Sequence, residues 1–332
     1  MHNNFKSINY SYQIHLRIFL YLNLLFFGIN NVSANTYFVS SEGSNQNLGS
    51  ISLPFKSIEY SLELLKEGDT LYIKQGIYFL SKQIKLKSNT HIFAYKNEKV
   101  EIHGTEQKVT WTLVSNNLWK CYQKDSVLQL FIDGKPYFQA AYPTISENIN
   151  AIKQGAFAVA YPNKEVFVEG LNQFSNLKGT RILGLHGKGL VSLNGFVEEQ
   201  NNNVVSIENY AFYWGEMYRN EYLDTGKAFI LGNKQFMNDN REWFWENGEL
   251  FLISDKDPNA LSIETRTTNY LLDLSNSTDI LISRISFVGA NINLSNTSNC
   301  KLIDCKFFSG SLNIFGLPVC PPLIVLFCKF SR

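Results

Sequence analysis

A small set of charged residues near the C-terminal end of the chain has a spacing at which side chains could act together. We expect Asp273, Asp279, Arg284, Asp304 and Lys306 to project outward there. Two carboxylates that flank a glycosidic bond can cleave it, at about 5 Å apart for retention of configuration and about 6.5–9.5 Å for inversion. No paired-carboxylate motif stands out among these residues, and turns and surface ion pairs use the same residue types. The catalytic residues are therefore unknown from the sequence.

Aromatic residues are the second group that a ligand-binding surface could use. The chain has five tryptophans, and an indole or phenol ring offers a large apolar face with one polar group. We predict that Tyr213 with Trp214, and Trp243 with Trp245, line a substrate-binding cleft. Core packing is the alternative use of the same residues in a β-rich segment.

Metal ligands are not predicted. The five cysteines, Cys121, Cys300, Cys305, Cys320 and Cys328, follow no metal-ligand spacing. The loop SSEGSNQNLGS at 40–50 offers oxygen ligands, but Glu42 is its only carboxylate, so it indicates a Ca²⁺ site only weakly. We expect no metal and no cofactor.

A twenty-residue repeat indicates which elements position these side chains. Residues 271–290 read LLDLSNSTDILISRISFVGA, and residues 291–310 read NINLSNTSNCKLIDCKFFSG. Apolar residues lie two apart within each copy, which is typical of short strands. The period is too short for helical-hairpin repeats, so it predicts the stacked coils of a parallel β-helix. Asn276 and Asn296 would form a structural ladder of amides on one turn; a β-sandwich is the alternative.

The first 34 residues predict export. Lys6 and Arg17 precede the apolar run IFLYLNLLFFGI, and Val32-Ser33-Ala34 is a small-x-small cleavage signal, as in secretory signal peptides. Without residues 1–34 the chain carries 28 basic and 29 acidic residues, which argues against a nucleic-acid partner. We expect a protein that is secreted, periplasmic or on the cell surface, with no membrane segment after cleavage.

Residues 36–103 contain a set of motifs that resembles a known superfamily. The order is Tyr-x-Val-Ser, Gly-Ser-x-x-Asn-x-Gly, Pro-Phe-x-Ser-Ile, Gly-Asp-Thr and Gly-x-Tyr, and it is similar to the opening of right-handed parallel β-helix proteins of the pectin-lyase-like superfamily. Pro54 is predicted to open a short helix with Phe55, Ile58, Leu62 and Leu65 on one face. A helix there would cap the apolar end of the first coil.

The middle of the chain loses the repeat and predicts an antiparallel insertion. Asp133-Gly134 and Asn247-Gly248 are hairpin signals between alternating apolar and polar residues. The stretch LFIDGKP…YP, followed by WFWENGELFL…DP, resembles the inserted domain of β-helix glycoside hydrolases such as β-xylosidases and α-fucosidases. In those enzymes, the resemblance implies, the active site lies on later coils that face the inserted domain.

We therefore predict an all-β fold, a right-handed parallel β-helix (solenoid) with an N-terminal capping helix, interrupted by an antiparallel β-rich domain. The expected units are a signal peptide (1–34), the cap and first coils (35–105), a β-sandwich-like insertion (106–265) and resumed coils (266–332) that we expect to be truncated. The expected function is that of a glycoside hydrolase-like protein acting on plant or algal polysaccharide, incomplete and inactive as given. The alternatives are a pectate-lyase-type polysaccharide lyase, which could need Ca²⁺, and a non-catalytic glycan-binding adhesin.

Overall fold

The computed structural model describes residues 34–80, 82–108, 110–145, 155–160, 164–186, 191–208, 224–239, 242–309, 312–313, 324–326 and 329–331. Their secondary structure is strands with one α-helix and three short 3₁₀ helices, η2 (Leu171–Gln173), η5 (Lys234–Phe236) and η6 (Pro258–Ala260). None of the helices in these residues has the length and apolar character that a membrane crossing requires. The predicted signal peptide lies outside the described residues except for Ala34, and its cleavage stays a prediction.

Three sheets contain only parallel strand pairs. The six-stranded sheet has the order β1 (Thr36–Val39), β2 (Thr70–Ile73), β5 (His91–Ala94), β23 (Leu281–Ser283), β26 (Lys301–Ile303), β29 (Ile324–Leu326). The four-stranded sheet has the order β4 (Ile84–Lys85), β22 (Leu272–Asp273), β25 (Ile292–Asn293), β28 (Leu312–Asn313). The five-stranded sheet has the order β3 (Gly76–Phe79), β6 (Val100–His103), β24 (Ser286–Val288), β27 (Lys306–Phe308), β30 (Lys329–Ser331).

The two copies of the repeat pair with each other in these sheets. Leu272 lies opposite Ile292, and Phe287 lies opposite Phe307, because each of these strands of the first copy pairs with the equivalent strand twenty residues later. The strands of the first copy also pair with residues near the N-terminus, as β23 does with β5. The parallel sheets therefore join segments that lie before and after the middle of the chain.

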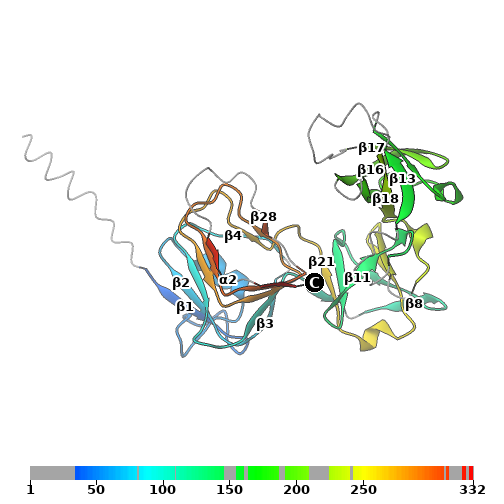
Figure 1. Cartoon of the computed structure of the whole chain (residues 1–332). Helices are drawn as coiled ribbons and strands as arrows, with labels where there is room; N and C mark the ends of the chain where they lie inside the picture. The colour runs from blue at the N-terminus through cyan, green and yellow to red at the C-terminus, as the bar shows by residue number, and fades with distance from the viewer. Residues whose placement is uncertain are drawn as a thin grey trace, which may run out of the picture.

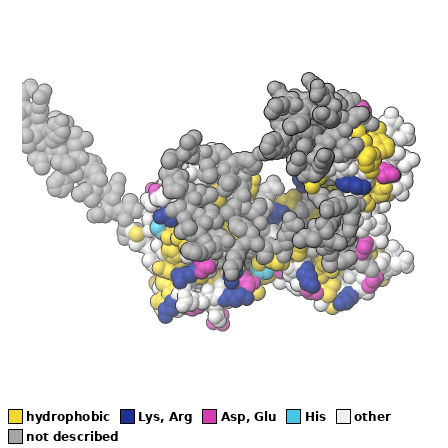
Figure 2. Space-filling view, viewed as in Figure 1, with side chains coloured by type: hydrophobic (Ala, Val, Ile, Leu, Met, Phe, Trp, Pro, Cys, Tyr) yellow, Lys and Arg dark blue, Asp and Glu magenta, His cyan; other side chains and the backbone are white. Residues whose placement is uncertain are grey.

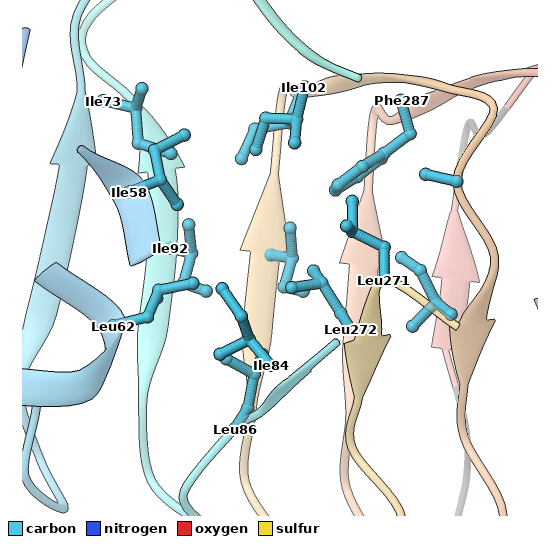
Figure 3. Close-up of a cluster of buried hydrophobic side chains, with 14 of the residues drawn as sticks. Ile58, Leu62, Ile73, Ile84, Leu86, Ile92, Ile102, Leu271, Leu272 and Phe287 are labelled. Carbon is cyan, nitrogen blue, oxygen red and sulfur yellow. The ribbon is translucent and has the colours of Figure 1, made fainter. Parts of the chain in front are cut away.

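One apolar core fills the space that these sheets share. Figure 3 shows its side chains pointing inward from successive strands, with Ile58 and Leu62 of the helix on one side. The rings of Phe287 and Phe307 are fully buried and stacked, with centroids 5.2 Å apart and 16° between their planes. Burial of this kind is the main source of free energy for this part of the fold.

The helix α2 (Ile58–Leu64) covers this core near β1 and β2. Ser57 is its N-cap, and the Ser57 hydroxyl accepts a hydrogen bond from the Tyr60 N–H at 3.1 Å, which satisfies one free donor of the first turn. The predicted apolar face is buried, but the helix begins at Ile58 rather than at Pro54. The extended Pro54–Ser57 segment pairs instead with β1, where Phe55 bridges to Val39.

An eight-stranded sheet lies between the two ends of the molecule (Figure 1). Its order is β7 (Glu106–Lys108), β21 (Ile263–Arg266), β10 (Gln129–Ile132), β11 (Lys135–Gln139), β19 (Glu242–Glu246), β20 (Glu249–Ile253), β9 (Leu118–Tyr122), β8 (Thr112–Ser115). Positive φ angles at Asp133-Gly134 (50° and 74°) and Asn247-Gly248 (51° and 86°) allow the two-residue turns between β10 and β11 and between β19 and β20. Both predicted hairpins are confirmed.

Seven strands form a barrel at the other end of the molecule (Figure 1). They are β12 (Ala141–Tyr142), β18 (Asp224–Leu231), β13 (Ala156–Ala160), β14 (Glu165–Val168), β17 (Val204–Glu208), β16 (Val191–Asn201) and β15 (Arg181–His186). Because β18 pairs with both β13 and β15, six of these strands close into a ring, and β12 pairs with β18 as well. A closed ring leaves no free sheet edge among those six strands.

The predicted fold class is wrong. A right-handed parallel β-helix is not what the described residues form as a whole: the sheets are mixed, and the two with the most strands are antiparallel apart from the parallel pair β11–β19. One of these two is a closed barrel. The twenty-residue pattern identifies the parallel pairs between its own copies, and it carries no information on how the strands in the rest of the chain pair. The described residues form an all-β fold of mixed sheets with one α-helix.

Candidate functional site

The aromatic residues predicted from the sequence do not gather at one described site. Tyr213 and Trp214 lie outside the described residues. Trp243 on β19 is only 2 % exposed, and its indole N–H donates to the Tyr137 carbonyl at 2.9 Å. Trp245 is half-buried against the same core and donates to the Gln123 carbonyl at 2.7 Å. Trp243 therefore packs in the core of the eight-stranded sheet, and a ring so covered has no face open to a ligand.

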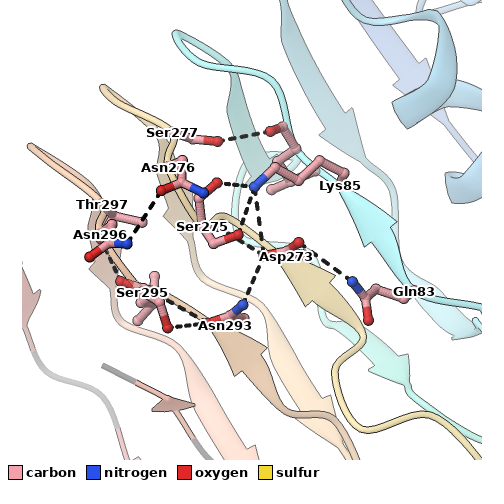
Figure 4. A network of polar contacts seen from close by, with 12 residues as sticks. Gln83, Lys85, Asp273, Ser275, Asn276, Ser277, Asn293, Ser295, Asn296 and Thr297 are labelled. Atoms are coloured by element: carbon pink, nitrogen blue, oxygen red, sulfur yellow. Dashed lines mark hydrogen bonds and ion pairs between the residues drawn. The ribbon is translucent and has the colours of Figure 1, made fainter. Parts of the chain in front are cut away.

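Asn276 and Asn296 lie on equivalent turns with left-handed φ angles of 57° and 54°. The Asn296 amide Nδ2 donates to the Asn276 Oδ1 at 3.4 Å, and Figure 4 shows this contact at the edge of a larger polar network. The backbone between the turns is joined separately, because the Asn276 N–H donates to the Ser295 carbonyl at 3.1 Å. The two amides are exposed and form a side-chain ladder.

Asp273 is the centre of the network in Figure 4. Its carboxylate accepts hydrogen bonds from the Ser275 N–H at 2.9 Å and from the Asn293 amide at 3.0 Å, and it lies 3.6 Å from the Lys85 ammonium. Burial opposes ionisation, but the contacts with Ser275 and Lys85 outweigh it and lower the Asp273 pKa. Asp273 is thus an ionised group that joins three adjacent strands, β4, β22 and β25, and not a proton donor.

The other predicted acidic residues occupy turns. Asp279 has a φ of 57°, and its carboxylate accepts a hydrogen bond from the Asn299 amide. Asp304 is exposed with a φ of 51°. Arg284 forms no described ion pair with Asp304; its guanidinium instead donates to the Ala94 carbonyl at 3.3 Å. These contacts stabilise turns and do not bring two carboxylates together.

A buried cluster joins the parallel sheets to the eight-stranded sheet. His103 ends β6, and its Nδ1 lies 2.9 Å from the Glu264 Oε2 on β21, which also accepts the Thr105 hydroxyl at 2.6 Å. His103 is 8 % exposed and Glu264 is 6 % exposed. Gly289 lies against the same junction with a φ of 57°, where an added Cβ would lie 2.9 Å from Thr105 and 3.0 Å from Phe131.

The electrostatics of this cluster favour an ionised Glu264. Burial alone raises the pKa of Glu264, but the hydrogen bonds from His103 and Thr105 outweigh it and hold that pKa below its usual value. An ionised carboxylate can only accept, so Nδ1 of His103 carries the proton and donates it to Glu264. Glu101 lies 3.6 Å from the His103 Nε2, and its hydrogen bond with Lys99 lowers its pKa as well. Neither carboxyl is a proton donor at neutral pH.

Glu242 has the opposite electrostatic behaviour. It is 2 % exposed, and burial raises its pKa despite backbone N–H donors from Asn238 at 2.8 Å and Asp239 at 3.2 Å. A raised pKa suits a general acid, but a substrate must also reach the group. The contacts of Glu242 are those of a side chain that fixes the turn before β19.

A solvent-open groove of about 550 Å³ lies on the barrel. Its walls are Asn172 of η2, the segment 174–178 that ends before β15, and the end of β16 with the turn at Asn202. No pattern in the sequence predicts this groove, because its polar residues are of ordinary surface types and are spread over thirty positions, from Asn172 to Asn202. Among the described residues no group of three or more His, Cys, Asp or Glu side chains is arranged to hold a metal ion.

Comparison with solved structures finds proteins whose fold is similar to that of this chain. A structure described as "Glycoside hydrolase" matches with a TM-score of 0.57 at 12% identity, over 83% of this chain and 65% of the other. The chain thus spans just under two thirds of that structure. XylC in complex with xylose matches with a TM-score of 0.38 at 13% identity, over 85% of this chain and 43% of the other. The Gp54 tailspike of Acinetobacter baumannii bacteriophage AP22, in complex with A. baumannii capsular saccharide, matches with a TM-score of 0.17 at 10% identity, over 79% and 41%.

Neither a protein-family model nor a curated protein matches the chain. At 12% identity the likeness to the first structure shows that the two share a fold, and the other two likenesses are too distant to carry an argument. The chain has the fold of a structure described as a glycoside hydrolase.

Proposed function

We propose that the protein is a carbohydrate-active protein of the glycoside hydrolase type, exported from the cell, that acts on plant or algal polysaccharide. The observation that carries the proposal is the likeness of fold to a structure described as a glycoside hydrolase, over 83% of this chain. A fold hosts more than one activity, so the chemistry of the surface must agree with it.

Charge and surface polarity support a carbohydrate partner. On the face in Figure 2 the described basic and acidic side chains are interspersed, and no single sign of charge forms a broad patch. Such a surface does not favour nucleic acid or strongly anionic polymers. A neutral glycan binds through hydrogen bonds and apolar contacts instead, and the amide-lined groove of the barrel offers both.

A second candidate is a glycan-binding protein without turnover, which one observation favours. The carboxyl groups with pKa shifts at the junction and on the parallel sheets are buried or held by hydrogen bonds, as for Glu264 and Asp273. Hydrolysis needs one carboxyl that donates a proton and one that stays ionised, on both sides of the bond. Glu264 and Asp273 are held ionised, and Glu242, whose pKa is raised, is only 2 % exposed, so none of these three can donate a proton to a bound glycan.

The test is an assay of the purified protein against soluble polysaccharides, with binding and product formation measured in parallel. Saturable binding to at least one polysaccharide is the expected result, and any product should appear as new reducing ends. Binding without products would favour the second candidate. Products that absorb in the ultraviolet would indicate elimination and contradict the hydrolase type, and failure to bind any glycan would overturn the proposal.

A further inference from the structure

The floor of the barrel groove is held in place by contacts within the protein. Leu177 is fully buried beneath it, and the half-buried Phe174 packs edge-on against Tyr142 and Phe236 at centroid distances of 4.9 and 4.8 Å. Three rings in contact hold the Phe174 side chain in one place. The groove therefore has a fixed apolar surface within a polar rim.

The backbone of the groove loop is held by side chains from outside it. The Gln200 amide donates to the carbonyls of Leu171 at 3.2 Å and Phe174 at 3.0 Å, and the Asn203 Oδ1 accepts the Asn172 N–H at 2.8 Å. Gln235 donates to the Ser175 carbonyl at 2.7 Å. A loop whose backbone is anchored at several points loses little entropy when a ligand binds.

Apart from Gln200, the amide and charged side chains that line the groove have, by contrast, no partner among the described residues. Asn172, Asn176, Lys178, Glu199 and Asn202 are all exposed, and none of their side chains has a hydrogen bond or an ion pair with another described residue. Three amides supply donors and acceptors at once, one ammonium supplies donors and one carboxylate supplies acceptors. The backbone of this site is fixed, while these five polar side chains are available to a ligand.

We propose that this groove is a binding subsite for a neutral oligosaccharide. The inference rests on the proposed function and adds to it a site and a ligand class. Each sugar hydroxyl both donates and accepts, which matches amides, and sugar C–H groups can pack on the Phe174 ring. Lys178 and Glu199 carry opposite charges on the same groove, so an anionic sugar would be attracted by Lys178 and repelled by Glu199. The groove, of about 550 Å³, is open to solvent, so it can hold one part of a longer sugar chain.

The experiment is calorimetric titration of the protein with three hexasaccharides: xylohexaose, cellohexaose and hexagalacturonate. The test variant is Asn172→Ala with Lys178→Ala, two exposed side chains whose removal should leave the fold intact. The matched control is Gln173→Ala, an exposed amide in the same loop that does not line the groove and donates to the Gly170 carbonyl. Near-ultraviolet circular dichroism checks that each variant is folded.

The expected result is binding of a neutral hexasaccharide that weakens about tenfold or more in the double variant, because two hydrogen-bonding groups are lost. The Gln173→Ala affinity should stay within about twofold of the original. Unchanged neutral binding by the folded double variant would overturn the groove assignment and leave the proposed function standing. Preference for hexagalacturonate, strengthened by Glu199→Gln, would overturn the ligand class. Failure to bind any glycan would overturn both the inference and the proposed function.

Discussion

Replacement of Phe287 by Ala tests the core that the parallel sheets share. Phe287 is fully buried, its ring stacks on Phe307 at 5.2 Å, and its backbone lies opposite Ile102 and Phe307 on the two neighbouring strands. Removal of a ring from such a site lowers the free energy of unfolding by about 3–5 kcal/mol, because the burial of the ring is lost and a cavity is left behind. The stacking itself accounts for about 0.5–1.5 kcal/mol of that, which the double variant with Phe307→Ala measures as a coupling energy.

Urea unfolding followed with two probes is the assay. Four of the five tryptophans pack in or against the core of the eight-stranded sheet, so fluorescence reports mainly on that core, while far-ultraviolet circular dichroism reports on all strands. Phe287→Ala should shift the circular dichroism transition, and Phe157→Ala, at a 39 % exposed position on the barrel, should cost less than about 0.5 kcal/mol. A loss below about 1 kcal/mol for Phe287→Ala would show that the repeat does not build a packed core.

Three further changes have defined outcomes. Asn296→Ala should lower the free energy of unfolding by about 1–2 kcal/mol, because Asn296 has a left-handed φ of 54° that alanine disfavours, and Asn296→Gly should lower it less. Equal losses for the two variants in urea unfolding would mean that the amide ladder matters more than the backbone. Because the folded pKa of Glu264 is lowered, its contribution to stability is present above its unfolded pKa and is lost as the pH falls through the folded value. Glu264→Gln should flatten that acid limb of stability against pH. It also replaces the charge-assisted hydrogen bonds from His103 and Thr105 by weaker neutral ones, at about 1–3 kcal/mol. An unchanged acid limb would refute this role. Cys300 is 1 % exposed, with its pKa raised by burial, so it should resist alkylation in the native protein, and rapid modification detected by mass spectrometry would contradict its burial.

The sequence predicted the local parts of the fold. Repeated residues such as Phe287 and Phe307 occupy equivalent environments, so one alignment of two copies identifies partners on adjacent strands. The hairpin at Asn247-Gly248 was equally accessible, because few residues adopt two consecutive positive φ angles. Periodicity within a segment contains this information.

The remainder depends on contacts between distant residues. The barrel closes where β15 pairs with β18, and no local pattern reports that pairing. His103 and Glu264 are 161 positions apart, so their contact exists only once the eight-stranded sheet docks on the parallel sheets. The groove is similar: Gln200 holds its loop across the barrel, and its free amides look like any polar surface in the sequence. The wrong fold class has the same origin, because the parallel pairing of the repeat in 271–310 was taken as the main architecture, with 106–265 as an insertion in it.

The most direct test of the central claim is whether a carbohydrate contacts the protein in solution. Saturation-transfer difference NMR of the purified protein with a mixture of neutral oligosaccharides measures this, because only sugar protons in contact with the protein gain signal. We predict transfer to the ring protons of at least one neutral oligosaccharide, which added unlabelled polysaccharide should suppress by competition. The absence of transfer to every sugar tested, with a folded protein, would contradict the account.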